Sequence, residues 1–283
     1  MENIIIPNPR ELEKTKQLIL SQGKENIHVI SDFDRTLTNA FVDGKKVPSV
    51  ISILREGPYL TKDYRERAIA LFKKYSPIEI NPEIPLEEKK RAMHEWWTAH
   101  FDLLIKSGLN KKDLEKIIED KTFKFREGAL EFIDILHENE IPLVIISSSG
   151  VGDAILMRLE KERRLYKNVY VVTNLYIWDK SGNAIGVKKP IIHSMNKDEI
   201  SIKEHPFYSK IRNRKNIILL GNILEDVEMV KGFSYSNIIK VGFLNDRVEE
   251  NLSLYKKNFD IVLLNDTSMH YVNELLKEIT LHK

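Results

Sequence analysis

The sequence predicts an α/β fold, in which helices flank a parallel β-sheet, with a helical segment inserted near the start of the chain. Two patterns support this prediction. Six short runs rich in isoleucine and valine are apolar at consecutive positions, as in strands that are buried on both faces. Helical patterns follow most of these runs, and such alternation is typical of βαβ units in a Rossmann-like domain.

The predicted elements of this domain lie in two blocks of the sequence. The expected strands are residues 27–31, 142–147, 169–173, 216–220, 238–243 and 260–264. The expected helices are residues 127–139, 152–165, 224–232, 247–257 and 268–277. We therefore assign residues 1–40 and 124–283 to one Rossmann-like core.

The segment between these blocks, residues 41–123, contains no strand of this kind and is predicted to form a helical cap. Apolar residues recur at helical spacing in residues 62–75, 86–107 and 110–120. Residues 76–85 contain three prolines, so we expect a loop there. Near the start of the cap, Asp43-Gly44 lies between short apolar flanks and indicates a small hairpin.

The composition excludes several classes of protein. Of the 283 residues, 42% are hydrophobic and 30% are charged, which is typical of a globular chain with a sizeable core. The 44 basic and 42 acidic residues nearly balance, which argues against binding to a nucleic-acid polymer or a polybasic attachment to membranes. The absence of cysteine excludes disulfides, cysteine-ligated metals and thiol catalysis. No apolar run approaches the roughly 18 residues of a membrane span, and the first residues lack the basic start of a signal peptide, so we expect a cytoplasmic protein.

The strongest chemical signal is the segment Ile-Ser-Asp-Phe-Asp-Arg-Thr-Leu-Thr, residues 30–38. Asp32 and Asp34 directly follow a predicted strand, and in an extended chain their side chains point to the same side. At the carboxyl edge of an open α/β sheet, such a pair can hold a hard cation or divide nucleophilic attack and proton transfer between two carboxylates. Two acids at this spacing also occur in solvated turns, so the pair alone does not decide the function.

A second group of polar residues follows the predicted strand 142–147. Here the sequence continues with Ser148, Ser149 and Gly150. A hydroxyl and exposed backbone N–H groups at a strand-to-helix turn suit a phosphate oxygen. The alternative is an ordinary loop that caps the next helix.

Two further segments complete the pattern. Lys188 and Lys189 follow the strand 169–173 after a loop, and a solvated lysine pair would explain them equally well. Asn222 follows the strand 216–220, and Asp226 lies four residues beyond it.

These four segments, in this order and each after a strand, resemble the four motifs of the haloacid dehalogenase superfamily of phosphohydrolases. Over nearly all its length, the chain looks like one family of that superfamily, the cytosolic pyrimidine 5′-nucleotidases of the UMPH-1 type. The segments that carry the closer resemblance are residues 8–9, 32–38, 95–98, 148–153, 192–197, 216–221 and 241–250.

The resemblance implies a Mg²⁺-dependent phosphatase of nucleoside 5′-monophosphates, with pyrimidines favoured, that acts through an aspartyl-phosphate. Asp32 would be the nucleophile, and Asp34 would protonate the leaving oxygen and then activate water. Ser148 and Lys188 would complete the catalytic set. By the same resemblance, a match to the segment that begins at Ile192 places the catalytic lysine at Lys188.

The resemblance also implies a set of binding residues. Ser149, Gly150 and Thr36 would bind the substrate at its phosphate end, and Glu95, with Trp96 or Trp97, would contact the base. The two tryptophans are adjacent on a helix, so at least one should pack in the core. The implied metal ligands are Asp32, Asp34, Asn222 and Asp226.

Asn222 departs from the family pattern, which has an aspartate at this position. An asparagine oxygen can ligate a hard cation but adds no charge. Asp226, with Glu225, would then have to keep enough charge for a weakened site, or the site would be a nucleotide-binding relic. An engineered change would also explain Asn222, and so would a plain helix cap with Glu225 as its partner.

Two alternatives to the nucleotidase therefore stay open. One is a phosphatase of another small phosphomonoester, because a fold does not fix the substrate. The other is a nucleotide-binding protein with little catalytic activity. In each case the expected partner is a small molecule, and we expect a monomer that binds neither a nucleic-acid polymer nor a membrane.

Overall fold

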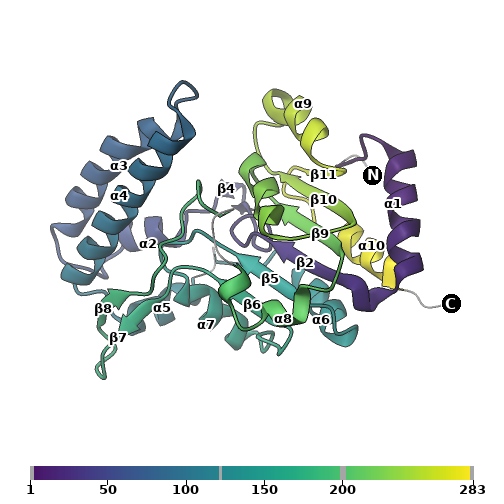
Figure 1. Ribbon diagram of the computed structural model, residues 1–283. Coiled ribbons are helices and arrows are strands. Elements are labelled where there is room, and N and C mark those ends of the chain that lie inside the picture. Colours follow the sequence, from purple (N-terminus) through teal and green to yellow (C-terminus); the bar gives the residue numbers. More distant parts are fainter. Residues whose placement is uncertain (1–2, 121–122, 198–201, 281–283) are drawn as a thin grey trace.

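The structure is a computed structural model that describes residues 3–120, 123–197 and 202–280. The remaining residues of the predicted core and cap (1–2, 121–122, 198–201 and 281–283) lie outside the described residues. The described part contains a seven-stranded sheet with the strand order β1-β11-β10-β9-β2-β5-β6 (Figure 1). Every neighbouring pair is parallel except β1 and β11, so the predicted parallel α/β sheet is confirmed.

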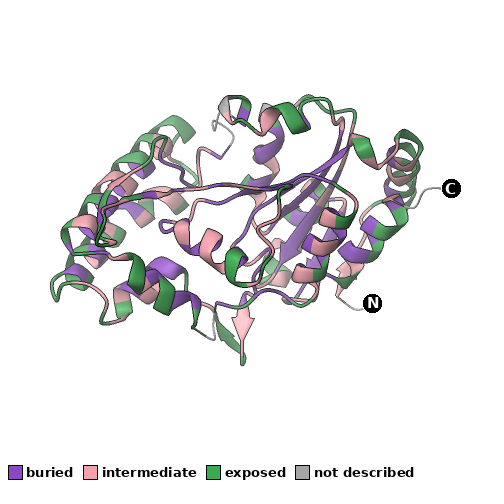
Figure 2. Ribbon diagram, turned by 90° about the horizontal axis from the view of Figure 1, so that it is seen from below, coloured by how far each residue is buried: buried purple, intermediate pink, exposed green. Residues whose placement is uncertain are grey.

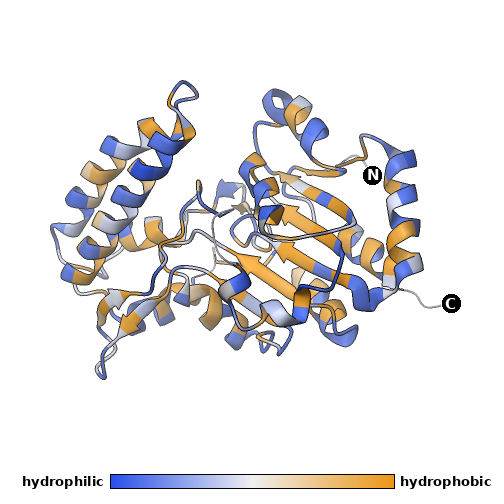
Figure 3. Cartoon of the chain, in the orientation of Figure 1, coloured by the Kyte–Doolittle hydropathy of each residue, from blue (hydrophilic) through white to orange (hydrophobic). Residues whose placement is uncertain are grey.

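All six predicted strands are present, and their ends differ from the prediction by no more than one residue. They are β2 (Ile27–Ser31), β5 (Leu143–Ile146), β6 (Val169–Val172), β9 (Asn216–Gly221), β10 (Asn237–Leu244) and β11 (Ile261–Leu264). The edge strand β1 (Ile4–Ile5) was not predicted, because two residues are too short to show a pattern. Figure 3 shows the central strands as almost continuously hydrophobic, as strands covered on both faces should be.

Helices cover both faces of the sheet, and successive residues of a strand pack on opposite faces. Val29 joins one apolar cluster and Ile30 the other. The first cluster includes residues of α1 (Pro9–Gln22), α6 (Ala129–Glu138), α7 (Asp153–Lys161) and α10 (His270–Thr280). The second includes the short α8 (Tyr208–Ile211), and α9 (Val248–Asn258) packs near β11. Figure 2 shows the buried strands between the more exposed helices.

One predicted helix of the core has a different form. Residues Leu224–Gly232 form 3₁₀ turns and not an α-helix. The buried carboxylate of Asp226 accepts hydrogen bonds from the backbone N–H groups of Asn222 (2.9 Å) and Ile223 (3.1 Å). These bonds hold the chain in a tight turn directly after β9, which accounts for the difference.

The described residues of the predicted cap region, 41–120 and 123, form four helices and the expected hairpin. The helices are α2 (Val50–Glu56), α3 (Tyr64–Ile80), α4 (Leu86–Lys106) and α5 (Lys111–Ile118). The hairpin consists of β3 (Phe41–Val42) and β4 (Lys45–Lys46). In Figure 1, α3 and α4 lie side by side, to the left of the sheet. Because α5 packs on α7, this region shares an apolar cluster with the core, and the cap boundaries 41–123 stay a prediction.

The loop predicted at residues 76–85 is shorter than expected. Helix α3 continues to Ile80 with Pro77 inside it, so only residues 81–85 connect it to α4. Proline removes one backbone hydrogen bond near the end of the helix. Tyr75 and Ile78, on either side of it, pack in a cluster with Met93 of α4, and this packing stabilises the last turn.

A second hairpin, β7 (Tyr176–Trp178) and β8 (Ala184–Val187), was not predicted. It lies between β6 and the loop that returns to the sheet, and β8 packs against α4. In the part of the chain that the structure describes, no helix is long and apolar enough to cross a membrane.

Candidate active site

Strand order brings the polar strand ends together. Strand β2 lies between β9 and β5, so Asp32, Asn222 and Ser147 follow three neighbouring strands at the same edge of the sheet. The backbone N–H of Asp32 donates to the carbonyl oxygen of Leu220 (2.9 Å), which extends the pairing with β9 beyond the strand. The candidate site is therefore at the carboxyl edge of a parallel sheet, where α/β folds bind ligands.

Lys197 is the central charge of this site. Its Nζ lies 2.6 Å from Oδ1 of Asp32 and 2.7 Å from Oδ1 of Asp226. The Lys197 side chain is only 4% exposed, and those of Asp32 and Asp226 are 7% and 0% exposed. Three buried charges therefore compensate one another, with one net negative charge left over.

The same contacts act on the pKa values. Burial raises the pKa of Asp32 above its ordinary value, and the charge of Lys197 opposes that rise. Burial likewise raises the pKa of Asp34, against the charges of Lys197 and Arg35 and a hydrogen bond with Ser147. Burial alone would lower the pKa of Lys197, but the carboxylates of Asp226 and Asp32 outweigh burial and raise it. Lys197 is therefore held as a cation at neutral pH.

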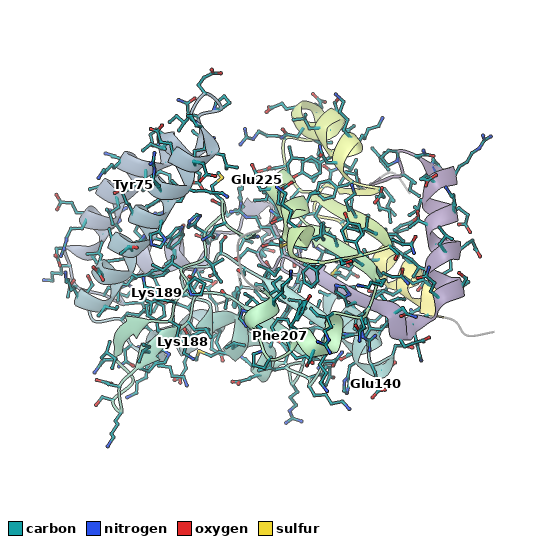
Figure 4. The ribbon with its side chains drawn as sticks, in the orientation of Figure 1. Tyr75, Glu140, Lys188, Lys189, Phe207 and Glu225 are labelled. Atoms are coloured by element: carbon teal, nitrogen blue, oxygen red, sulfur yellow. The ribbon has the colours of Figure 1, made fainter. Side chains whose placement is uncertain are left out.

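The structure does not bring Lys188, the lysine predicted for this role, to the two aspartates. Lys188 is exposed at the end of β8, where its backbone N–H donates to the carbonyl oxygen of Leu175 (2.8 Å). Figure 4 labels it beside the β7–β8 hairpin. The chain needs nine more residues after the hairpin to return to the sheet edge, which puts Lys197 in the site. The assignment to Lys188 is corrected accordingly.

Asp226 also differs from its predicted role as a metal ligand. Its Oδ1 pairs with Lys197, and its Oδ2 accepts from the backbone N–H groups of Asn222 and Ile223. Both oxygens are thus engaged inside the protein. Asp226 fixes the lysine and the turn after β9, so it is better described as a positioning residue.

The side-chain amide of Asn222 lies against two oxygen atoms of the first motif. Because both neighbours are acceptors, the amide nitrogen faces them, 3.1 Å from Oδ2 of Asp32 and 3.3 Å from the backbone oxygen of Asp34. A half-turn of the amide presents its oxygen instead, and three oxygens converging at one point suit a hard cation such as Mg²⁺. Among the described residues, no cluster of three or more His, Asp or Glu side chains could hold a metal. The residues fit Mg²⁺, but with one carboxylate and two neutral donors.

The remaining residues of the first two motifs surround Asp32. Thr36 is fully buried and donates from its hydroxyl to Oδ2 of Asp32 (3.2 Å), so it orients the carboxylate and does not face the substrate as predicted. Ser148, Ser149 and Gly150 line the same cavity as Asp32, as expected of a phosphate-binding loop. The Asn174 side chain donates to the carbonyl oxygen of Ser149 (3.0 Å) and fixes this loop.

The cavity beside these residues has a volume of about 340 Å³ and runs from the sheet edge to the cap. Asp32, Asp34 and Lys197 lie at one end. At the other end are aromatic rings from α3 and α4: Phe72, Trp96, Trp97 and His100. Trp96 and Trp97 are stacked with ring centres 6.1 Å apart, and both line the cavity. An aromatic wall of this kind suits the flat face of a base.

Glu95, predicted to contact the base, does not line this cavity. It is exposed on the other side of α4, in a separate surface hollow with His94 and Asn196. Successive residues on a helix point about 100° apart, so Trp96 and Trp97 can share the face toward the cavity, whereas Glu95 lies about 200° from Trp97 and faces away. The predicted pair is therefore split: Glu95 lies outside the cavity, whereas Trp96 and Trp97 both line it.

Sequence reasoning missed Arg126, which is 2% exposed and holds the loop that follows Asp34. Its guanidinium donates to the backbone oxygens of Thr36 (2.8 Å) and Arg35 (2.6 Å) and pairs with Asp266 (2.9 Å). Asp266 in turn accepts from the backbone N–H groups of Ala40 and Phe41. A single arginine has no recognisable sequence signal, because its partners are mainly backbone carbonyls.

Comparisons with known proteins agree with the family resemblance seen in the sequence. A family model described as pyrimidine 5′-nucleotidase (UMPH-1) matches residues 35–280. A protein of Gallus gallus named 7-methylguanosine phosphate-specific 5′-nucleotidase is 36% identical over 275 residues, which cover 97% of this chain and 95% of the relative. The crystal structure of cytosolic 5′-nucleotidase IIIB bound to cytidine has a TM-score of 0.89 and 31% identity, with 99% and 94% of the two chains covered. A phospho-aspartyl intermediate analogue of phosphoserine phosphatase, at 17% identity, has a TM-score of 0.51 over 88% of this chain and 97% of the other, and shares the fold.

Proposed function

Because this chain belongs to the UMPH-1 family of pyrimidine 5′-nucleotidases, we propose that it hydrolyses nucleoside 5′-monophosphates to nucleoside and phosphate. Pyrimidine nucleotides are the favoured substrates in this proposal. The reaction is that of a phosphomonoester hydrolase of the haloacid dehalogenase type. The observation that carries the proposal is the Asp32–Lys197–Asp226 group at the polar end of a cavity whose other end is aromatic. A phosphate and a flat base fit these two ends. A cytoplasmic location and a monomeric state remain predictions.

In the proposed reaction, Asp32 attacks phosphorus and the bond from phosphorus to the 5′-oxygen breaks. Asp34, which lines the cavity next to Asp32, gives its proton to the leaving oxygen. Water then attacks the aspartyl-phosphate and loses a proton to Asp34, so that phosphate is released and both aspartates return to their first state. The charge of Lys197 favours the ionised carboxylate of Asp32 before attack, and its ammonium group orients that carboxylate toward phosphorus.

Mg²⁺ would be held by Asp32, the backbone oxygen of Asp34 and the amide oxygen of Asn222. Bound there, it would neutralise charge on the phosphoryl oxygens and on the attacking carboxylate. The phosphate would also meet the Ser148 hydroxyl and the backbone N–H groups of the following loop, which line the cavity. The protein groups that would hold Mg²⁺ and the phosphate all lie at the same edge of the sheet.

Phosphate release from UMP, CMP, AMP, GMP and ribose 5-phosphate, with and without Mg²⁺, tests the proposal. We expect Mg²⁺-dependent release that is fastest with UMP or CMP and is absent in Asp32→Asn. Release from ribose 5-phosphate at the same rate as from the nucleotides would favour a general phosphatase of small phosphomonoesters. No release from any of them would contradict the proposal.

Asn222 supports a second candidate, a nucleotide-binding protein with little turnover. The neutral amide leaves the cation site one negative charge short of the family pattern. Equilibrium binding of UMP without detectable phosphate release, at any Mg²⁺ concentration tested, would favour this second candidate.

A further inference from the structure

The aromatic end of the cavity has a distinctive charge. Besides the aromatic rings, its polar lining includes Arg55 of α2 and Ser52 one turn before it. The only carboxylates that line the cavity, among the described residues, are Asp32 and Asp34 at the opposite end. A base in this cavity would therefore meet a guanidinium and no carboxylate.

The position of Arg55 is held by its neighbours on α2. Its Nε lies 3.3 Å from a carboxylate oxygen of Glu56, and one terminal nitrogen donates to the Ser52 hydroxyl (3.3 Å). Its guanidinium carbon lies 5.9 Å from the centre of the Phe72 ring, which also lines the cavity. The other terminal nitrogen has no hydrogen-bond partner among the residues that the structure describes. Arg55 is thus fixed beside the aromatic wall with donors available.

The histidine ring at this end of the cavity adds no second charge. His100 is buried, stacks on Trp97 and shares a hydrogen bond of 3.0 Å with the Tyr64 hydroxyl. Burial, with a contribution from the charge of Arg55, lowers the pKa of His100 to about 4. The imidazole is therefore neutral near pH 7, and Arg55 carries the formal charge at this end. Glu56 also pairs with Arg65 on the exposed side, 2.7 Å away, so its charge is shared outside the cavity.

We propose that Arg55 selects the base: it donates to carbonyl and ring-nitrogen acceptors of a neutral base stacked on the aromatic wall, and it repels a base that carries a positive charge. This inference rests on the proposed nucleotidase function and specifies its substrates. Uracil, cytosine and guanine all present such acceptors, and arginine binds the O6/N7 pair of guanine through two donors. Methylation of guanine at N7 removes one of these acceptors and makes the base cationic.

The proposal separates this chain from relatives whose names specify 7-methylguanosine phosphate. An aromatic wall by itself attracts a cationic base through cation–π interaction. A guanidinium beside the wall cancels that advantage, since two like charges would lie in one partly dehydrated cavity. We therefore expect GMP and 7-methyl-GMP, which differ by one methyl group and one charge, to be distinguished in favour of GMP.

Dissociation constants measured by isothermal titration calorimetry test the proposal without turnover, in an Asp32→Asn background. The probes are UMP, GMP and 7-methyl-GMP. We expect GMP to bind about 10- to 100-fold more tightly than 7-methyl-GMP, which is the range for one charge-assisted hydrogen bond. Adding Arg55→Gln should bring the GMP to 7-methyl-GMP ratio close to one, and Arg55→Glu should invert it.

Arg67→Glu is the matched control, because it makes the same change of charge on the neighbouring α3. Arg67 is exposed, pairs with Asp63 and does not line the cavity, so the ratio should not change. Arg55→Gln guards against misfolding, since it keeps a polar side chain of similar length. Two results would overturn the proposal. One is equal affinity for GMP and 7-methyl-GMP in the Asp32→Asn protein, and the other is a GMP to 7-methyl-GMP affinity ratio that both Arg55 variants leave unchanged.

These outcomes are distinct from failure of the nucleotidase function. If the wild-type chain releases no phosphate but GMP binds more tightly than 7-methyl-GMP in an Arg55-dependent way, the proposed reaction is wrong and the base selection stands. If the chain hydrolyses 7-methyl-GMP with the higher kcat/KM and binds it more tightly, the nucleotidase stands and the role of Arg55 is wrong.

Discussion

Replacement of Lys197 by methionine provides the sharpest test of how the site is built, because methionine fills similar space without the charge. The change would leave Asp32 and Asp226 buried, at 7% and 0% exposure, without the cation that lies 2.6 and 2.7 Å from them. Removing one partner of a buried ion pair costs about 3–5 kcal/mol. Since whole domains are stable by only about 5–15 kcal/mol, this would be a large share of the total.

Urea denaturation followed by circular dichroism measures that cost. With a slope of about 3 kcal/mol per molar urea, the loss corresponds to a fall of about 1–1.7 M in the transition midpoint. In the same samples, phosphate release should fall by at least about 100-fold, because an oriented cation next to the reacting phosphate is lost. A cooperative transition in the variant shows that it is folded when activity is measured.

Lys188→Met is the matched control, and it separates the two assignments of the lysine. Lys188 is exposed at the end of β8, and surface substitutions of this kind usually change stability by less than about 0.5 kcal/mol. Its activity should equal that of the wild type. An inactive Lys188→Met beside an active, equally stable Lys197→Met would refute the reasoning about the site.

Three further changes have predictable results. Asn222→Asp restores a charge at the cation site, so the Mg²⁺ concentration for half-maximal activity should fall several-fold. Mg²⁺ should also raise the melting temperature of this variant more than that of the wild type. Equal or weaker Mg²⁺ effects would contradict the assignment of Asn222 as a ligand. Burial and the nearby charge of Arg214 lower the pKa of His28 to about 4, below its unfolded value near 6.5, so its contribution to stability is present above about pH 6.5 and is lost as the pH falls toward 4. The wild type should therefore lose about 2 kcal/mol more than His28→Leu between pH 7 and pH 5, and equal losses in urea titrations would count against this account. Gly150→Ala would place a methyl group 2.4 Å from the Trp97 ring, so KM for UMP should rise about 10-fold, and an unchanged KM would show that the ring gives way freely.

The sequence predicted the sheet well because its strands are buried on both faces and carry continuous apolar runs. Asp32 and Asp34 lie at the expected edge of the sheet for a related reason: the position of a residue directly after a strand is set by that strand. The edge strand β1 and the β7–β8 hairpin lacked such a pattern. The helix at Lys62–Tyr75 was predicted, but its extension past Pro77 depends on tertiary packing that local propensity does not contain.

The two misplaced site residues have different physical causes. Lys197 reaches Asp32 from a loop, and the path of that loop depends on a hairpin that sequence reasoning had not recognised. Lys197 is the last residue of the segment 192–197, which carries part of the family resemblance. The pair Asn196-Lys197 was the sequence feature that could have identified it. Glu95 was misplaced because adjacent helix positions face different surroundings, and periodicity alone does not say which of two neighbours faces the cavity.

The place of β2 in the middle of the sheet has a consequence for how the protein is made. Strand β2 pairs with partners far along the chain, since Val29 pairs with Leu143 and Ile27 with Asn216. Parallel pairings between segments this distant raise contact order and slow folding, whereas α3 and α4 can associate through local contacts. At about 5–20 residues per second, a ribosome takes about 10–40 s to synthesise the stretch from β2 to β9. During that interval the apolar strand β2, which leads directly into Asp32, lacks β9 as a neighbour, and we expect nascent chains to depend on chaperones at this stage.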